Sequence, residues 1–252
     1  MYKNKKVFAI INCKESFNEK KQLTKAKKKE FEERLKEIEE LEYGEGYFDK
    51  PILINTLDVF ENSEIIDEIY LIVDENEDEK IRNLVKEYKI SKVEDFILAD
   101  NLRQYSMEEA LYKIAKTDKK PQFLITHDAR VPFISEDTIL ELTEGMHKNM
   151  ATVYGTPLKD SVKKVNLDTM KIEDKIGVIE LWETQFPKMF LSGILMSAYD
   201  YAEEFNLYSE DDATLIEYMR FPIKVLRGNS NNIMLDTSIF DTLNRLFSKK
   251  AK

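Results

Sequence analysis

An acidic side chain follows a short apolar run near the middle of the chain, where a buried strand would end. Residues 123–126 are apolar or β-branched, and Asp128 follows them, with Arg130 close behind and Pro132 before the next helix. In open α/β sheets ligands bind beyond the carboxyl ends of the strands, so an Asp in this place can hold Mg²⁺ together with the phosphate oxygens of a substrate. The alternative is a turn Asp that caps its own backbone.

Composition limits the other kinds of site. The chain has 252 residues with 38 Lys and Arg against 48 Asp and Glu, a net charge of −10, which disfavours binding to duplex nucleic acid through phosphate contacts. A single cysteine, Cys13, and two histidines, His127 and His147, exclude a disulfide within the chain, a cysteine-based zinc site and a three-histidine metal centre. Glycine, on which phosphate-binding loops usually depend, occurs only 7 times. An anionic ligand must therefore be bound by a local group of cations.

Short apolar runs alternate with helical patterns along most of the chain. Strands are predicted at 7–11, 69–73, 96–98, 123–126, 151–154, 223–226 and 233–235. Helices are predicted at 51–60, 79–88, 107–115, 136–148 (capped by Ser135), 188–205, 211–218 and 238–247. Such alternation predicts an α/β fold with a doubly wound, mostly parallel sheet of the Rossmann-like kind, and no repeat or linker divides the predicted single domain over residues 1–252.

Two segments depart from this alternation. Residues from about 24 to 42 are rich in Lys and Glu and predict an amphipathic helix, whose basic start at 25–29 faces either an anionic ligand or solvent. Residues from about 156 to 180 are short alternating pieces between turn residues, and they predict a β-arm that projects from the sheet. The longest uncharged stretch, 189–199, is too short to cross a membrane, and the N-terminus has no signal-peptide core, so we expect a cytoplasmic protein.

The segment around Asp128 and five further segments, in order and spacing, resemble the cytidylyltransferases that act on methylerythritol phosphate or ribitol 5-phosphate. ITHDARVPFIS at 125–135 is similar to the HDAxRPF motif of that family, and LRGNSNNIMLDT at 226–237 to its C-terminal segment containing NIK. The other matches are KPILINTL at 50–57, TPLKDSVKKV at 156–165, ETQFPKMF at 183–190 and DDATLIEY at 211–218. The resemblance therefore covers the chain from residue 50 onward.

The resemblance implies the transfer of CMP from CTP to a polyol phosphate with release of pyrophosphate, on a nucleotide-diphospho-sugar transferase fold. It implies a homodimer paired through the β-arm. The net charge and the lack of a long apolar stretch predict that neither nucleic acid nor a membrane is a partner. Mg²⁺ would be held by Asp128 and by Asp236, although Asp236 could instead cap a strand end. The residues that the resemblance assigns are Asn12, Lys20, Arg103, Ser106 and Asp128 for the nucleotide, Lys21, Lys159 and Lys175 for catalysis, and Ser161, Lys175 and Thr184 for the acceptor. Ser106 has an alternative role in a helix capping box with Glu109.

Three departures from the family pattern leave the activity open. The family's glycine-rich first loop corresponds here to IINCKESFNEKKQL at 10–23, without glycine. Met234 stands where the family has the Lys of NIK, and Arg130 stands one position earlier than the arginine of the motif. The chain is then either an active cytidylyltransferase with a rebuilt loop or an inactive relative that binds a nucleotide or a protein partner. A third hypothesis is a glycosyltransferase-like enzyme with metal ligands from the acidic run at 73–78. The residues do not decide between the two acceptors, nor do they establish CTP as the donor.

Overall fold

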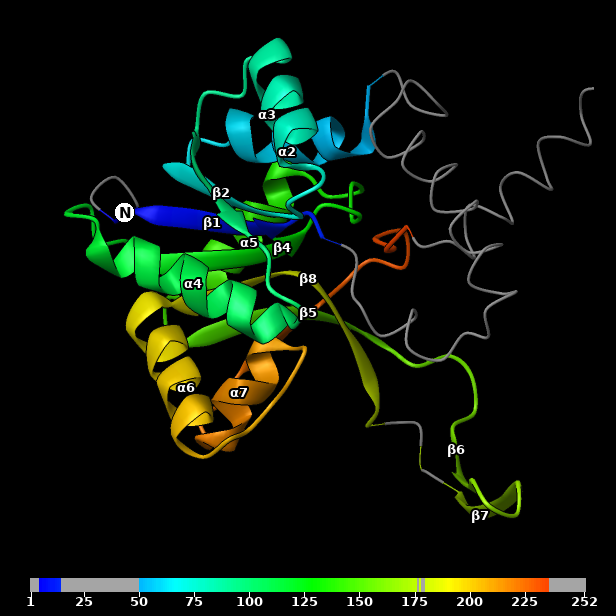
Figure 1. Ribbon diagram of the computed structural model, residues 1–252. Helices are drawn as coiled ribbons and strands as arrows, with labels where there is room; N and C mark the ends of the chain where they lie inside the picture. Colours follow the sequence, from blue (N-terminus) through cyan, green and yellow to red (C-terminus); the bar gives the residue numbers. More distant parts are fainter. Residues whose placement is uncertain (1–4, 15–49, 176, 178–179, 236–252) are drawn as a thin grey trace, which may run out of the picture.

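The computed structural model describes residues 5–14, 50–175, 177 and 180–235, and its central element is a seven-stranded sheet (Figure 1). The strand order is β3-β2-β1-β4-β8-β5-β9. The strands are β1 (Val7–Asn12), β2 (Glu68–Val73), β3 (Val93–Leu98), β4 (Phe123–Asp128), β5 (Ala151–Pro157), β8 (Trp182–Leu191) and β9 (Lys224–Arg227). Among these seven strands, β8 alone runs antiparallel to its neighbours. The predicted mostly parallel α/β sheet is confirmed.

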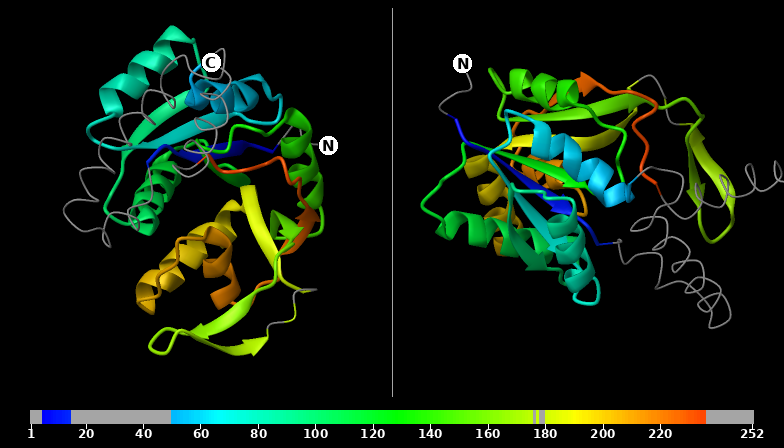
Figure 2. Two further views of the ribbon diagram at one scale, coloured as in Figure 1. Left: turned by 90° about the vertical axis from the view of Figure 1, so that its right-hand side faces the viewer. Right: turned by 90° about the horizontal axis from the view of Figure 1, so that it is seen from above.

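Helices cover both faces of the sheet (Figure 2). On one face lie α2 (Ile52–Asn62), α3 (Asp78–Glu87) and α5 (Glu136–Gly145), and on the other lie α4 (Arg103–Lys116), α6 (Ser192–Glu204) and α7 (Asp212–Tyr218). Successive residues of β1 alternate between the two cores, with Ala9 and Ile11 in the first and Phe8 and Ile10 in the second. A strand buried on both faces explains the unbroken apolar run in the sequence.

The strand order reverses between β1 and β4. The chain continues from β1 to β2 on one side, whereas β4 pairs with the other side of β1 in parallel. Asn12 at the end of β1 is in register with Asp128 at the end of β4. Crevices at such reversal points, beyond the carboxyl ends of the strands, are where α/β proteins bind ligands.

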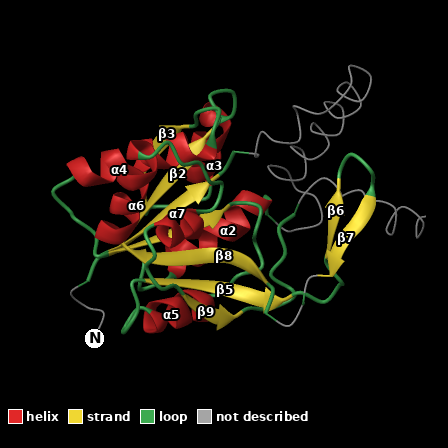
Figure 3. Cartoon of the chain, turned by 90° about the horizontal axis from the view of Figure 1, so that it is seen from below, coloured by secondary structure: helices red, strands yellow, loops and turns green. Residues whose placement is uncertain are grey.

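A separate two-stranded antiparallel sheet forms an arm that projects from the main sheet (Figures 1 and 3). Its strands are β6 (Lys163–Asn166) and β7 (Lys171–Lys175), within the predicted range of about 156–180. Three apolar side chains of the arm are largely exposed, Leu167 at 83%, Met170 at 75% and Ile172 at 65%. A two-stranded hairpin without a core of its own is marginally stable in water, so the arm is suited to packing against another surface.

Several predicted boundaries are wrong. Residues 188–191 belong to β8 and not to a helix, because their apolar run fits a strand buried on both faces as well as a buried helix. Residues 233–235 form no strand, although the Leu235 N–H donates to the carbonyl of Arg130 at 2.8 Å. The helix that Ser135 caps, as predicted, ends at Gly145 and not at 148. The predicted helices at 24–42 and 238–247 lie outside the described residues.

Over the described part of the chain, no helix is long and apolar enough to cross a membrane.

Candidate active site

Asp128 is held by the turn that follows it. Arg130 donates its backbone N–H (3.0 Å) and its Nε–H (2.9 Å) to Oδ1 of Asp128, and Nη2 donates to Oδ2 at 3.0 Å. Asn12 donates from Nδ2 to the same Oδ2 at 3.4 Å, and only 4% of Asp128 is exposed. Burial alone would raise the pKa of the Asp128 carboxyl, but the adjacent Arg130 guanidinium outweighs it and lowers that pKa. The carboxylate is therefore ionised and already neutralised by its own turn.

The donors at this point suit Mg²⁺ chemically, but they do not form a complete metal site. Asp128 and Asn12 offer oxygen ligands, which Mg²⁺ prefers. Within the described ranges, no three His, Cys, Asp or Glu side chains gather as a metal site, so the acidic run at 73–78 does not supply one. Asp78 of that run binds Arg82 at 2.8 Å instead. A metal at Asp128 would thus depend on phosphate oxygens of a bound nucleotide and would compete with Arg130. Asp236 lies outside the described residues.

His127 supports the same turn from inside. Its Nε2 lies 3.1 Å from the carbonyl oxygen of Val131, and its ring packs between Phe60 and Phe186 at centroid distances of 5.2 and 6.1 Å. Burial lowers the pKa of His127 to about 4, so the ring is neutral near pH 7 and donates from Nε2. The turn after β4 is consequently fixed on both sides, by His127 to its backbone and by Arg130 to Asp128.

Arg103, predicted to contact the nucleotide, is bound inside the protein. It begins α4, and its Nη1 and Nη2 donate to the two carboxylate oxygens of Asp212 at 2.7 and 2.8 Å. Tyr199 donates to the same carboxylate at 2.6 Å. Burial would raise the pKa of Asp212, but Arg103 holds it at about 2. Arg103 therefore joins α4 to α7 through its ion pair with Asp212.

Ser106 is likewise engaged within the fold. Its hydroxyl accepts from the N–H of Asp100 at 2.9 Å and lies 3.3 Å from the carbonyl of Leu102. The capping box predicted for Ser106 and Glu109 is wrong, because α4 already begins at Arg103 and its N-cap is Leu102. Ser106 thus fixes the loop that follows β3, beside the predicted nucleotide site.

Lys14 is a cation at this edge of the sheet that the sequence analysis missed. Its Nζ donates to the carbonyl of Asp100 at 2.7 Å and lies 3.7 Å from the Asp74 carboxylate. Asn12 accepts from the Lys14 N–H at 3.3 Å and donates to its carbonyl at 2.8 Å. Lys14 therefore connects the ends of β1 and β2 with the loop after β3. Its position two residues beyond a buried strand, in a loop without glycine, was the available signal.

The residues predicted to bind the acceptor lie on the arm and at its base. Lys159 and Ser161 are exposed in the segment between β5 and β6, and Lys175 ends β7. Thr184 pairs with Gly155 in the ladder between β5 and β8. The arm points away from the main sheet (Figure 1), so β7 carries Lys175 away from that sheet, whereas Thr184 lies in the main sheet itself.

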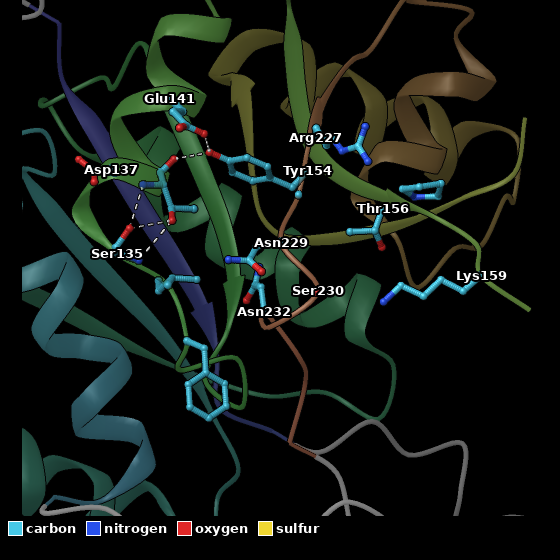
Figure 4. Close-up of a pocket in the computed structure, with 15 residues that line it drawn as sticks. Ser135, Asp137, Glu141, Tyr154, Thr156, Lys159, Arg227, Asn229, Ser230 and Asn232 are labelled. Atoms are coloured by element: carbon cyan, nitrogen blue, oxygen red, sulfur yellow. Dashed lines mark hydrogen bonds between the residues drawn. The ribbon is translucent and has the colours of Figure 1, made fainter. Parts of the chain in front are cut away.

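A cavity of about 790 Å³ lies next to the segment that follows the Asp128 turn, where Phe133, Ile134 and Ser135 line it (Figure 4). Its walls are the start of α5, the end of β5, the base of the arm and residues 227–232. Asp137 and Glu141 line it from α5, and Lys159 and Arg227 line it from the other side. Tyr154 donates to the Glu141 carboxylate at 2.8 Å. Of the predicted site residues that the structure describes, Lys159 is the one that lines this cavity.

A mostly parallel sheet with a carboxylate at the reversal of its strand order defines an α/β fold of the nucleotidyltransferase kind. A crystal structure of 4-diphosphocytidyl-2C-methyl-D-erythritol synthase from Anaerococcus prevotii DSM 20548 superposes with a TM-score of 0.76, covers 98% of both chains and is 21% identical. The 2-C-methyl-D-erythritol 4-phosphate cytidylyltransferase of Thermus thermophilus gives a TM-score of 0.65 at 16% identity, over 94% of this chain and 98% of that one. These likenesses establish the fold.

Sequence comparison establishes the family. The family model of 2-C-methyl-D-erythritol 4-phosphate cytidylyltransferase matches residues 34–242. The relative of that name from Alkaliphilus metalliredigens (strain QYMF) is 33% identical over 189 residues, 75% of this chain and 77% of its own. The one from Halalkalibacterium halodurans is 31% identical over 192 residues, 75% of this chain and 80% of its own. The chain belongs to the 2-C-methyl-D-erythritol 4-phosphate cytidylyltransferase family, as the resemblance indicated. β1 and the glycine-free segment after it precede the matched range.

Proposed function

We propose that this chain transfers CMP from CTP to 2-C-methyl-D-erythritol 4-phosphate. A phosphate oxygen of the acceptor attacks the α-phosphorus of CTP, the bond from that phosphorus to the oxygen bridging to the β-phosphate breaks, and pyrophosphate leaves. Family membership carries the proposal, and it favours methylerythritol over ribitol as the acceptor because the matched family model bears the former name. The placement of Asn12 and Asp128 at the reversal of strand order supports it.

The reaction brings two anionic molecules together, so fixed charges at the carboxyl edge decide its rate. We assign Asp128 and Asn12 to the nucleotide side, with Lys14 beside them in the loop where the family has glycines. Arg103 and Ser106 serve that side by fixing the loop after β3 and the start of α7, since both side chains are bound within the protein. Lys20 and Lys21 lie outside the described residues and remain predictions.

We further propose that Mg²⁺ binds together with the nucleotide. Asp128 would hold it, and when bound it would neutralise charge on the triphosphate. The bound cation would then share with the Arg130 guanidinium the neutralisation of the Asp128 carboxylate. Support for the proposal is the buried, ionised carboxylate of Asp128 beside the Asn12 amide, at the point where the strand order reverses.

We propose that a second copy of the chain completes the acceptor side. The arm carries its predicted residues away from the Asp128 of the same chain, and its large apolar side chains are exposed. Pairing of two arms across a twofold axis would cover these side chains and bring Lys175 and Ser161 toward the partner's nucleotide side, whereas Thr184 stays on the main sheet of its own chain. We therefore propose a homodimer that exchanges its arms.

The direct test measures pyrophosphate release from CTP and Mg²⁺ with methylerythritol, ribitol and glycerol phosphates as acceptors. We expect release with the methylerythritol compound, matched by formation of its cytidine diphosphate derivative. Asp128→Asn is expected to lose about 100-fold or more in kcat/KM, in line with losses of single groups that stabilise transition-state charge. Asp118→Asn, at an exposed turn before β4, is the matched control and should keep its activity.

Other outcomes would select another hypothesis. No release with any acceptor, together with a thermal shift induced by CTP, would favour the inactive relative, since Arg103, Ser106 and Asp128 are all bound internally here. Neither release nor CTP binding would contradict both. Hydrolysis of a nucleoside diphosphate sugar would favour the glycosyltransferase-like alternative.

A further inference from the structure

Residues 228–235, which we call the strap, cross the carboxyl end of the sheet from β9 to the turn after Asp128. At one end the Gly228 N–H donates to the carbonyl of Gly155 at 2.7 Å. At the other end the Leu235 N–H donates to the carbonyl of Arg130 at 2.8 Å, and Leu235 is buried. The strap also forms a wall of the cavity in Figure 4 through Asn229, Ser230 and Asn232. Its position therefore bears on the Asp128 turn directly.

The middle of the strap is held by one side chain from β8. Gln185 donates from Nε2 to the carbonyls of Asn229 and Asn232, each at 3.0 Å. Asn232 donates back to the carbonyl of Phe186 at 2.6 Å. Gln185 directly follows Thr184, which the family pattern places on the acceptor side. One residue thus links the acceptor-side strand to the segment that ends at the nucleotide side.

Gly228 makes room for this contact. A Cβ added to Gly228 would lie 2.0 Å from Oε1 of Gln185 and 3.3 Å from the carbonyl oxygen of Gly155. Gly228 does not have a positive φ, so its backbone conformation is open to any residue. Glycine is required at position 228 because the Gln185 side chain occupies the space that a Cβ would need. The contact therefore depends on both residues together.

The contact is not arranged for maximum stability. The amide oxygen of Gln185 and that of Asn232 are both buried without a hydrogen-bond partner among the described residues. A buried acceptor left in this state costs about 1–3 kcal/mol. Local features that lower stability in this way are concentrated at functional positions.

We propose that Gln185 is a positioning residue for cytidylyl transfer. Its two hydrogen bonds fix the strap, and the strap fixes the backbone of Arg130 beside Asp128. Gln185 thereby holds two parts of the chain at a fixed position relative to each other: its neighbour Thr184 in β8 and the Asp128 turn. This inference rests on the proposed function, because the geometry that Gln185 maintains matters for a reaction between the two sides.

The first test replaces the side chain. Gln185→Ala removes both hydrogen bonds, and we expect a roughly 10- to 100-fold lower kcat, on the order of a misplaced reacting group, with a smaller change in the KM for CTP. Amide hydrogen exchange at Ile233 and Leu235 should become faster while exchange in β1 and β4 is unchanged. A variant that is folded by circular dichroism and keeps wild-type kcat would overturn the proposal.

The second test uses the space around Gly228. Gly228→Ala alone should displace Gln185 and lower kcat to a similar extent. In the Gln185→Ala background the same change should lower kcat by less than about twofold, because the colliding side chain is absent. Gly193→Ala, where nothing lies within 4 Å of the added Cβ, is the control and should be silent.

The results distinguish a failure of this proposal from a failure of the proposed function. An inactive wild-type enzyme contradicts the proposed function. An active wild type in which the losses of Gln185→Ala and Gly228→Ala multiply contradicts the unit formed by Gln185 and Gly228. If Gln185 only stabilises the fold, its replacement should lower the melting temperature in step with activity and change kcat and KM to the same extent. That result would also contradict the proposal.

Discussion

Arg103 and Asp212 form a bidentate ion pair that joins the first residue of α4 to the first residue of α7. The side chain of Asp212 is fully buried and that of Arg103 is 12% exposed. The preceding residue, Asp211, binds the buried Lys188 of β8. Two consecutive carboxylates at the start of α7 thus gather one cation from α4 and one from β8. The layer of helices next to the candidate site depends on this point.

Removal of one member of the pair should be costly. Asp212→Asn leaves the guanidinium of Arg103 buried without its counter-ion, and breaking a buried ion pair in this way costs about 3–5 kcal/mol. We expect a loss of that order in the free energy of unfolding, measured by urea denaturation at pH 7. Asp200→Asn, at an exposed position of α6, is the control, and an equal loss in both variants would contradict the assignment.

The same pair predicts the direction of the pH dependence. The pKa of Asp212 is about 2 in the folded protein, below the ordinary value of an Asp carboxyl. A depressed folded pKa contributes stability above the unfolded pKa of about 4 and loses it as the pH falls toward 2, here about 2 kcal/mol. The difference in unfolding free energy between wild type and Asp212→Asn should therefore narrow from about pH 5 to about pH 2. A constant difference over that range would show that another group is responsible.

The pair of Asp128 and Arg130 makes a different prediction, about cations. Arg130→Ala should lower the free energy of unfolding by about 3 kcal/mol. The reason is that the Asp128 side chain, which is 5% exposed, loses the guanidinium that neutralises it. Millimolar Mg²⁺ should restore part of that loss in the variant, because a cation can then reach both oxygens. The melting temperature of the wild type without nucleotide should not respond to Mg²⁺. Equal responses of the two proteins would exclude competition between Arg130 and the metal.

The fold could be predicted from sequence where a strand is buried on both faces. β1 and β4 begin with apolar runs because both faces of the sheet are covered by helices, and the polar residues Asn12 and Asp128 end them. The strand β8 (Trp182–Leu191) was missed altogether, and its residues 188–191 were predicted as helix because a run such as Lys-Met-Phe-Leu fits a buried helix equally well. Its pairing partners, Thr126 in β4 and Val153 in β5 opposite Lys188, are distant in the sequence.

The site could be predicted only as far as local pattern reaches. Asp128 was found because it follows a strand end, and its place beside Asn12 follows from the sheet register. The internal roles of Arg103 and Ser106 could not be predicted, since Asp212 lies 109 residues beyond Arg103 and the start of α4 is not marked by a side-chain cap. The contact of Gln185 with Gly228 depends in the same way on β8 and the strap, which the fold brings together.

The arm makes the last prediction, which concerns assembly. Leu167 is 83% exposed and Ile172 65% exposed on a hairpin without a core of its own, so a second copy must cover them if the arm pairs as proposed. Wild-type protein should sediment as a dimer at micromolar concentration. Leu167→Glu with Ile172→Glu introduces charges into the proposed interface and should produce monomers. Activity should then fall at least tenfold while CTP binding is kept, because the partner's acceptor-side residues are lost. Tyr112→Glu, at a position 56% exposed in the middle of α4, introduces a similar charge away from the arm and should remain dimeric and active. A wild-type protein that sediments as a monomer, or a fully active monomeric double variant, would contradict the exchange of arms.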